Sequence, residues 1–221
     1  MAVKNPTICV ICGLNTCLPC IMPYPPLILA SSSPLRRTLL KRLGIPFATA
    51  TPNVDETRQP DESPQELVVR LAEAKAKAVV ADHSDALVIG SDQVAYLDDA
   101  VIGKPENRAQ AIAQLTRASA RQVVFYTGLC LFNAATGRTQ ICCEPFRVHF
   151  RRLSRTRIEA YLDRERPFDC AGSFRSESLG IALFERLEGD DPNALVGLPL
   201  IRLISMLESE GIDPLESMRD T

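Results

Sequence analysis

The stretch LILASSSPLRR, residues 27–37, constrains the fold most, because it joins a strand, a loop and a helix start in one short run. PLILA, residues 26–30, is continuously apolar, which is typical of a strand covered on both faces. Ser33 then stands where a helix N-cap belongs, and Pro34 occupies the first helical position. Leucines recur every four positions until Gly44. The sequence therefore predicts a buried strand followed directly by a helix.

A second helix signal begins with a capping box from Ser63 to Glu66 and continues to about Ala81. Lys75 lies on the apolar face of this predicted helix. A buried ammonium group is costly unless it is paired. We therefore expect the side chain of Lys75 either to extend to water or to meet a carboxylate or a phosphate.

The run ALVIGSDQV reads as another buried strand, whose apolar part covers residues 86–89 and ends at Gly90. Ser91, Asp92 and Gln93 are then expected to emerge at the end of this strand. Open α/β sheets hold their ligands at the carboxyl ends of strands. This position makes Asp92 a candidate functional residue, although a loop residue that caps a neighbouring amide would look the same.

The rest of the chain alternates between helix and strand signals. VVFYTGLCLFN and EPFRVHFRRL read as two long strands joined by a turn at NAATG, which predicts a hairpin. Three further helices are predicted over residues 107–118, 155–164 and 198–209. Helices interleaved with strands and a hairpin predict an α/β fold, with a mixed sheet flanked by helices.

Composition limits the class of protein. At 221 residues with 46% hydrophobic content, the chain is expected to form one domain over residues 22–221, divided at most into two lobes. A net charge of -2 argues against nucleic acid or an anionic membrane as a partner. No apolar run reaches the length of a membrane span, so we expect a cytoplasmic protein. Walker, dinucleotide-binding and serine-hydrolase motifs do not occur in the sequence.

Residues 1–21 differ from the rest, because they hold two C-x-x-C pairs in CVICGLNTCLPC. The short spacer between the pairs suits neither a usual zinc module nor an iron–sulfur cluster. We expect a disordered extension, or residues foreign to the native chain, rather than a metal site.

Three cations are candidates for binding an anion. Arg36 and Arg37 fall in the first turn of the first predicted helix, where free backbone N–H groups and the helix dipole favour an anion. Guanidinium groups add paired donors that suit phosphate oxygens. Lys104 lies in a GKP turn and points outward. The alternative is that all three are ordinary solvated cations.

Two carboxylates complete the candidate chemistry. Glu56, in TPNVDE, follows a strand-like segment, and Asp55 beside it is an equally good candidate. With Asp92, such a carboxylate would suit metal-assisted attack on a phosphoanhydride, because carboxylates hold the ion and orient water. Spacing along the sequence does not show that these groups converge.

From Leu27 to about Leu215 these segments, in this order, resemble the Maf family of nucleoside triphosphate pyrophosphatases. The resemblance is carried by LILASSSPLRRTLL, VDET, ESPQELVVRLAEAKA, VIGSDQV, GKP, VVFYTGL, CAGSFRSESLG and DPNALVGLPL. It implies hydrolysis of a nucleotide between its α and β phosphates, with a divalent cation such as Mg²⁺ or Mn²⁺. It also implies a mixed α/β fold with two lobes around a central cleft.

The resemblance assigns roles to individual positions. Asp92 is implied to be the proton acceptor, and Glu56 a carboxylate near the metal and the attacking water, so that both are implied metal ligands. Lys75 completes the implied catalytic group. The implied phosphate contacts are Ser31, Arg36, Arg37, Lys75 and Lys104.

Within the family, GSDQV and SFRSE are similar to the YceF branch, which acts on 7-methyl-GTP. The dTTP/UTP branch would have Thr at Gln93, Gln at Glu177 and Arg at Leu35. The Glu177 carboxylate could accept two N–H bonds from a guanine edge, and a cationic, methylated purine would strengthen them. Leu35 departs from the aromatic residue usual in this branch, and so lacks a cation–π contribution of about 0.5–2 kcal/mol.

Two other functions compete with this prediction. One is pyrophosphatase activity on dTTP or UTP. The other is a regulatory protein that binds a nucleoside triphosphate and turns it over slowly. The sequence leaves open whether the chain forms a homodimer.

Overall fold

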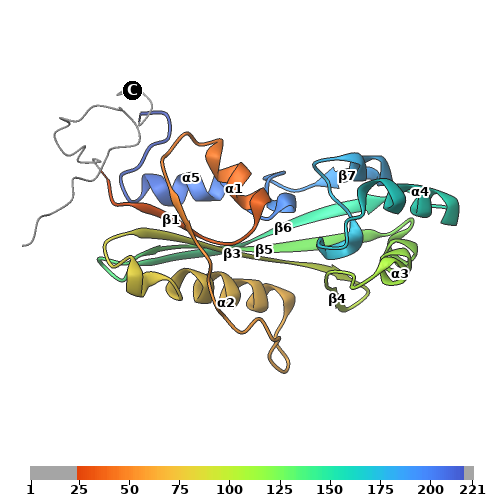
Figure 1. The fold of residues 1–221 in the computed structure, drawn as a ribbon, viewed down its shortest axis with the longest axis horizontal. Helices are drawn as coiled ribbons and strands as arrows, with labels where there is room; N and C mark the ends of the chain where they lie inside the picture. Colours follow the sequence, from red (N-terminus) through yellow and green to blue (C-terminus); the bar gives the residue numbers. More distant parts are fainter. Residues whose placement is uncertain (1–23, 217–221) are drawn as a thin grey trace, which may run out of the picture.

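The apolar runs of the chain pair into one mixed sheet, drawn as arrows in Figure 1. This computed structural model describes residues 24–216, so the prediction for residues 1–21 lies outside the described part. Within it the sheet has seven strands in the order β2-β1-β3-β5-β6-β7, with β4 paired to β3. The strands are β1 (Leu27–Ala30), β2 (Ala48–Ala50), β3 (Leu87–Leu97), β4 (Ala100–Ile102), β5 (Gln122–Asn133), β6 (Thr139–Phe150) and β7 (Phe184–Glu188).

Helices cover both faces of this sheet. Figure 1 shows α2 on one face, α1 and α5 on the other, and α3, α4 and β7 gathered at one end. The α-helices are α1 (Pro34–Lys41), α2 (Pro64–Lys77), α3 (Arg108–Ala118), α4 (Arg155–Glu165) and α5 (Leu200–Glu208). Short 3-10 helices are η1 (Val80–Asp82), η2 (Ala171–Ser173), η3 (Leu179–Leu183) and η4 (Ala194–Val196).

The strand directions match the predicted fold class. β1 runs parallel to β2 and to β3, and α1 connects the parallel pair β1 and β2. β3, β5, β6 and β7 are antiparallel neighbours, and the predicted hairpin is formed by β5 and β6. The mixed α/β prediction is therefore confirmed.

The predicted helix starts are confirmed by their caps. The side chain of Ser33 accepts from the backbone N–H of Arg36 at the start of α1. Ser63 and Glu66 form both bonds of the capping box at the start of α2. The predicted end of α2 at about Ala81 is wrong, because Val79 already has non-helical dihedrals (φ −109°, ψ 2°) and η1 follows.

The prediction that Ser91, Asp92 and Gln93 lie at the end of a strand is also wrong. β3 continues to Leu97, because β5 pairs with it along residues 87–96. On the other side, β1 pairs only with residues 87–90 of β3, and β4 only with residues 95–97. Residues 91–94 of β3 therefore face a break between β1 and β4, which we call the sheet gap.

The hydrophobic core is divided into two parts along the sheet. One cluster lies among β4, α3, α4 and β7, and includes Ala95 and Leu97 of β3. The other clusters lie on the two faces around β1, where β3 contributes Leu87, Val88 and Ile89. Residues 91–94 of β3 join the two parts, which agrees with the predicted two lobes and places the sheet gap between them.

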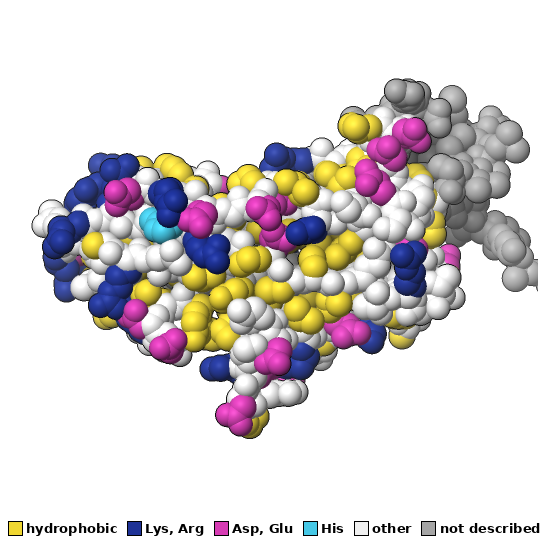
Figure 2. Space-filling view, turned by 180° about the vertical axis from the view of Figure 1, so that it is seen from behind, with side chains coloured by type: hydrophobic (Ala, Val, Ile, Leu, Met, Phe, Trp, Pro, Cys, Tyr) yellow, Lys and Arg dark blue, Asp and Glu magenta, His cyan; other side chains and the backbone are white. Residues whose placement is uncertain are grey.

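The molecular surface is not uniform. Seen from behind, Figure 2 shows Lys and Arg side chains gathered at the end formed by α3, α4 and β7, and apolar side chains across the middle. The exposed apolar residues of the described part include Ile141 in β6 and Ile201 in α5. No helix among residues 24–216 combines the length and the apolar character needed to cross a bilayer.

Candidate active site

The site is built around one ammonium group held between two carboxylates. Lys75 Nζ lies 2.6 Å from Asp92 Oδ1 and 2.6 Å from Glu56 Oε1. The side chain of Lys75 is 9% exposed and that of Asp92 11%, whereas that of Glu56 is 62% exposed. The expectation that a lysine on the apolar face of α2 meets a carboxylate is confirmed. Removing both carboxylates would leave Lys75 as an uncompensated buried charge, which is strongly unfavourable.

Two glycines let α2 come close enough for this contact. A Cβ added to Gly90 in β3 would lie 2.0 Å from the carbonyl oxygen of Ala72. A Cβ added to Gly128 in β5 would lie 2.1 Å from the carbonyl oxygen of Val68. Any side chain at either position would push α2 away from the sheet. The two glycines therefore determine how deeply Lys75 reaches toward Asp92.

The loop that carries Glu56 is tied to α2 by a second ion pair. Arg70 Nε and Nη2 donate to the two carboxylate oxygens of Glu62 at 2.6 and 2.9 Å, and Nη2 also donates to the carbonyl of Thr57 at 3.0 Å. Asp55, the alternative candidate, instead accepts from the backbone N–H of Thr57. Glu56, and not Asp55, is therefore the carboxylate of this loop that meets Lys75.

Arg36 comes from the opposite face of the sheet. Its Nε donates to the carbonyl of Gly197 at 2.8 Å, and Ser91 Oγ donates to the same carbonyl at 2.8 Å. Burial lowers the pKa of Arg36, and the negative charges of Asp92 and Glu56 oppose this shift. A guanidinium group remains protonated under such shifts. Gly197 has φ +106°, and a Cβ there would lie 3.2 Å from Arg36 Nε, so this position favours glycine.

Positive charges converge on Glu56. The hydrogen bond from Lys75 lowers the pKa of Glu56, burial opposes the shift, and the charges of Lys75, Lys104 and Arg36 lower it further. These cations come from α2, the turn after β4 and α1. Three of the cations predicted from the sequence therefore lie near the same carboxylate.

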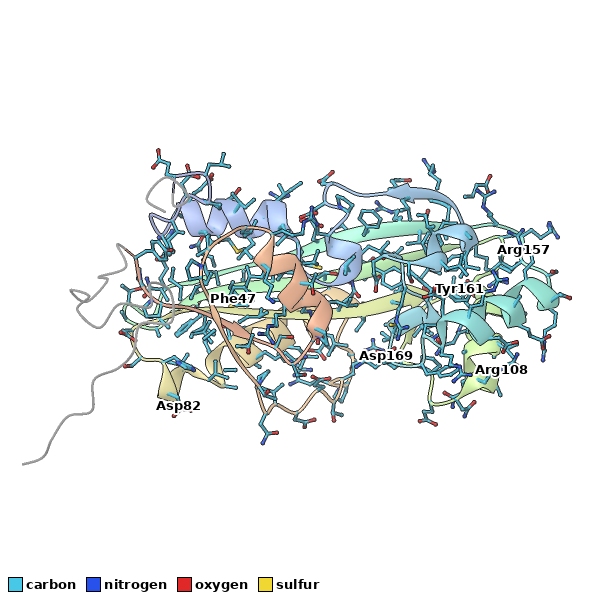
Figure 3. All side chains as sticks on the ribbon, turned by 45° about the horizontal axis from the view of Figure 1, so that its top comes forward. Phe47, Asp82, Arg108, Arg157, Tyr161 and Asp169 are labelled. Carbon is cyan, nitrogen blue, oxygen red and sulfur yellow. The ribbon has the colours of Figure 1, made fainter. Side chains whose placement is uncertain are left out.

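A cavity of about 170 Å³ adjoins these charges on the η4 side. Arg36 and Lys104 line it together with the three positions predicted to determine base choice: Leu35, Gln93 and Glu177. Phe125 and Phe174 add aromatic side chains to the lining, and Asp169, labelled in Figure 3, also lines the cavity. The oxygen Oδ1 of Asp169 accepts from Arg175 Nη2 at 2.6 Å, so a cation already neutralises this carboxylate. Glu177 is exposed and has no cationic partner within residues 24–216.

Neighbouring residues of β3 serve the two sides of the site. Asp92 points toward α2, where it meets Lys75, and Gln93 points toward η4, where its amide bonds to backbone carbonyls. Side chains alternate between the faces of a strand, so both orientations follow from adjacent positions. The sheet gap leaves this edge of β3 open, so that a single ligand can extend from one face to the other.

Ser31 and Arg37 lie at the margin of this arrangement. They line a separate groove of about 460 Å³ beside α1 and β2, together with Lys41 and Thr49. Ser31 is buried, and its Oγ accepts from the backbone N–H of Ser33 at 3.1 Å. Arg37 is exposed. The structure thus places these two predicted phosphate contacts next to the cavity lined by Arg36 and Lys104, and not within it.

A scan against protein-family models matches residues 26–210 to the family described as Maf-like protein. This chain belongs to the Maf family. The matched range holds every site residue predicted from the sequence, from Ser31 to Glu177.

The match between this chain and curated Maf relatives covers almost the whole length of those relatives. A protein of Vibrio vulnificus (strain CMCP6) named 7-methyl-GTP pyrophosphatase is 56% identical over 189 residues, which is 86% of this chain and 97% of that protein. One of the same name from Nitrosococcus oceani is 57% identical over 190 residues, covering 86% and 96%. A third, from Colwellia psychrerythraea (strain 34H), is 53% identical over 189 residues, covering 86% and 94%.

The sequence did not indicate the role of several residues that shape the site in this Maf chain. Arg70 and Glu62 hold the loop of Glu56, yet each looks like an ordinary charge on a helix or a loop. Thr127 and the carbonyl of Ala194 contact Gln93. The available signal for Thr127 was a hydroxyl residue in the middle of the apolar run VVFYTGLCLF.

Proposed function

We propose that this chain hydrolyses 7-methyl-GTP between its α and β phosphates, giving 7-methyl-GMP and diphosphate. The observation that carries the proposal is the convergence of Asp92, Lys75 and Glu56 with Arg36 and Lys104 beside one cavity. The names of relatives that are 53–57% identical support the choice of substrate. The proposed compartment is the cytoplasm.

Asp92 is the proposed proton acceptor. Water attacks one of the two phosphorus atoms beside the bridging oxygen and gives its proton to the carboxylate, and the bond from that phosphorus to the bridging oxygen breaks. Lys75 keeps Asp92 oriented, because its ammonium donates to Oδ1. Arg36 and Lys104 are placed to neutralise phosphate oxygens, since both line the cavity near Glu56. Ser31 and Arg37 are proposed to contact phosphates from the adjoining groove.

The carboxylates fit a divalent cation such as Mg²⁺ or Mn²⁺. Within residues 24–216, neither Oε2 of Glu56 nor Oδ2 of Asp92 has a hydrogen-bond partner, so one hard oxygen ligand remains on each. The same residues contain no group of three His, Cys, Asp or Glu that could hold an ion. Magnesium is typically held by one or two carboxylates together with substrate phosphates. Such an ion would withdraw charge from phosphate oxygens.

The cavity is proposed to hold the base. The Glu177 carboxylate only accepts hydrogen bonds, so it suits the N–H groups at N1 and N2 of guanine. A 7-methylated guanine is cationic, which strengthens these bonds and favours a wall that carries an unneutralised carboxylate. Leu35 lies in the wall and offers apolar contact in place of aromatic stacking.

The test is an assay of diphosphate release from 7-methyl-GTP, GTP, dTTP and UTP with Mg²⁺ or Mn²⁺. We expect the highest kcat/KM for 7-methyl-GTP, because it alone combines the guanine edge with a positive charge. A preference for dTTP or UTP would reject the proposed substrate but retain the reaction. Release from none of the four, together with tight nucleotide binding, would favour a regulatory binding protein.

A further inference from the structure

The carboxamide of Gln93 is held in one orientation by three oxygens. Its Nε2 donates to Thr127 Oγ1 at 2.9 Å, to the carbonyl of Ala194 at 2.7 Å and to the carbonyl of Leu195 at 3.2 Å. Thr127 lies directly opposite Gln93 on β5 and is fully buried. Its hydroxyl donates to the carbonyl of Ala194 at 2.9 Å, so the proton of this hydroxyl is already used. The lone pairs of Oγ1 are therefore what Gln93 meets.

The reversed amide is excluded by the same contacts. Turning the carboxamide by 180° would place Oε1 against the carbonyl oxygens of Ala194 and Leu195 and against the lone pairs of Thr127. Carbonyl oxygens cannot donate, so the contacts with Ala194 and Leu195 would become repulsive, and so would the contact with Thr127 as long as its hydroxyl donates to Ala194. The orientation thus follows from hydrogen-bond chemistry.

The oxygen of the amide is left for a ligand. Within residues 24–216, Gln93 Oε1 has no hydrogen-bond partner, and none of the buried side-chain N or O atoms in this part lacks a partner. Oε1 is therefore accessible, and Gln93 lines the cavity beside Glu177. Oε1 of Gln93 and the carboxylate of Glu177 thus both offer hydrogen-bond acceptors to the cavity.

We propose that Thr127 is a positioning residue, which with the carbonyls of Ala194 and Leu195 fixes Gln93 so that only its oxygen faces the base. Resting on the proposed function, this makes the pocket selective for bases whose edge carries donors. Guanine offers N–H groups at N1 and N2. Adenine offers an acceptor at N1, which would meet another acceptor, and buried acceptors that face each other are strongly disfavoured.

The test compares Thr127→Val with Thr127→Ser, using 7-methyl-GTP and ATP as substrates. Valine keeps the shape but removes the acceptor for Nε2, whereas serine keeps the hydroxyl. We expect Thr127→Val to lower the ratio of kcat/KM for 7-methyl-GTP over ATP by about three- to ten-fold, the size of one neutral hydrogen bond. The loss should appear in KM, with kcat little changed, because Gln93 contacts the base. Thr127→Ser should retain the wild-type ratio.

A control separates positioning from stability. Cys130→Ala truncates another fully buried residue of β5, one that packs in the cluster beside α2 and away from the cavity. It should lower the thermal midpoint and leave the substrate ratio unchanged. An unchanged ratio in folded Thr127→Val, or the same loss in Thr127→Ser or Cys130→Ala, would overturn the inference.

The outcomes also distinguish this inference from the proposed function. If the wild type does not turn over 7-methyl-GTP, the proposed reaction fails, and calorimetric binding of 7-methyl-GMP and AMP then tests the positioning of Gln93 directly. A preference for 7-methyl-GMP that falls in Thr127→Val would still support the inference. Equal binding of the two monophosphates by the wild type would overturn it.

Discussion

Lys75 balances the charges of the site at the scale of single residues. Its ammonium contacts Asp92 and Glu56 at 2.6 Å each, and its side chain is almost fully buried. A buried ammonium is costly without an ionic partner. The two carboxylates supply that partner, and Lys75 in turn holds the carboxylate of Asp92, the proposed proton acceptor, in one orientation.

Replacing Asp92 by Asn tests this role with little change of shape. The amide cannot take a proton from water, so we expect kcat to fall by about 10²–10⁴-fold. The fold should persist, because Lys75 keeps Glu56 as a partner. Steady-state kinetics and a thermal melt measure the two effects. Asp98→Asn, which alters an exposed ion pair beyond β3, serves as control, and near-normal kcat in Asp92→Asn would reject the assignment.

Whether the role of a single residue can be predicted from the sequence depends on how far along the chain its contact partners lie. Lys75 could be identified because it interrupts an apolar helix face, which is a local pattern. The contact of Thr127 with Ala194 could not, because it joins β5 to a 3-10 turn 67 residues later. Only the folded chain brings that backbone carbonyl to Gln93. Local patterns reveal an unusual residue but not a distant partner.

At the scale of elements, the docking of α2 on the sheet positions the proposed catalytic group. At Gly90 and Gly128 the backbone of α2 lies closer to the sheet than any residue with a side chain would permit. Such overpacking is relieved only by shifts of whole elements. Because Lys75 extends from α2 to a strand residue, any outward movement of the helix lengthens the contact with Asp92.

Gly128→Ala should therefore impair stability and activity together. The new methyl group would lie 2.1 Å from the carbonyl of Val68, so we expect a loss of about 1–3 kcal/mol in the free energy of unfolding. We also expect a reduced kcat. Gly103→Ala, where no atom lies within 4 Å of the added Cβ, should leave stability unchanged. Urea denaturation measures the stability of both variants, and equal stability of the two would contradict the close-approach argument.

The pair of Glu62 and Arg70 predicts a dependence on pH. The hydrogen bond from Arg70 lowers the pKa of Glu62 below its ordinary value of 4.5. A carboxyl group with a lowered pKa in the folded state adds stability above its ordinary pKa, and this stability is lost as the pH falls through the lowered value. The loop of Glu56 should thus loosen in acid.

Glu62→Gln measures this contribution. At neutral pH the variant should be about 1–3 kcal/mol less stable than the wild type, because Arg70 loses its charged partner. The difference should shrink as the pH is lowered below 4.5. Urea denaturation over a pH series provides the measurement. Glu73→Gln, which alters an exposed pair with Lys77, should cost less than about 0.5 kcal/mol, and a pH-independent difference for Glu62→Gln would contradict the assigned cause.

Helices and strands were predictable where their signals lie in the local sequence. They were less predictable where pairing between distant strands decides the length of an element. Caps and leucine spacing predicted the starts of α1 and α2. The length of β3 was not predictable, because its second half exists through antiparallel pairing with β5 after β1 has ended. The sheet gap, and with it the placing of Asp92 inside a strand, follows from that long-range pairing.

The molecule as a whole has two cores on one sheet. β3 passes without interruption from the core around β1 to the core among α3, α4 and β7. β5 contributes Leu129 and Leu131 to one core, and Val123 and Phe125 to the other. Neither lobe can lose its structure without disturbing strands that belong to both.

Unfolding should therefore be one cooperative transition. Phe150, which packs edge to face against Phe174 and Phe184, belongs to the lobe of α4, and Leu40 belongs to the lobe of α1. Phe150→Ala should destabilise the protein by about 3–5 kcal/mol, and Leu40→Ala by about 2–5 kcal/mol. Each should shift a single calorimetric peak to lower temperature. Separate peaks for the two lobes in either variant would contradict this expectation.

The sheet gap also bears on self-association. Open strand edges recruit foreign strands, and proteins limit that hazard by keeping such edges short or covered. The free edge at residues 91–94 is brief, and β1 and β4 bound it on both sides. A neighbouring chain would find too few peptide groups there to begin a ladder. The backbone groups at this edge can thus remain without a strand partner between the two lobes without promoting fibril formation.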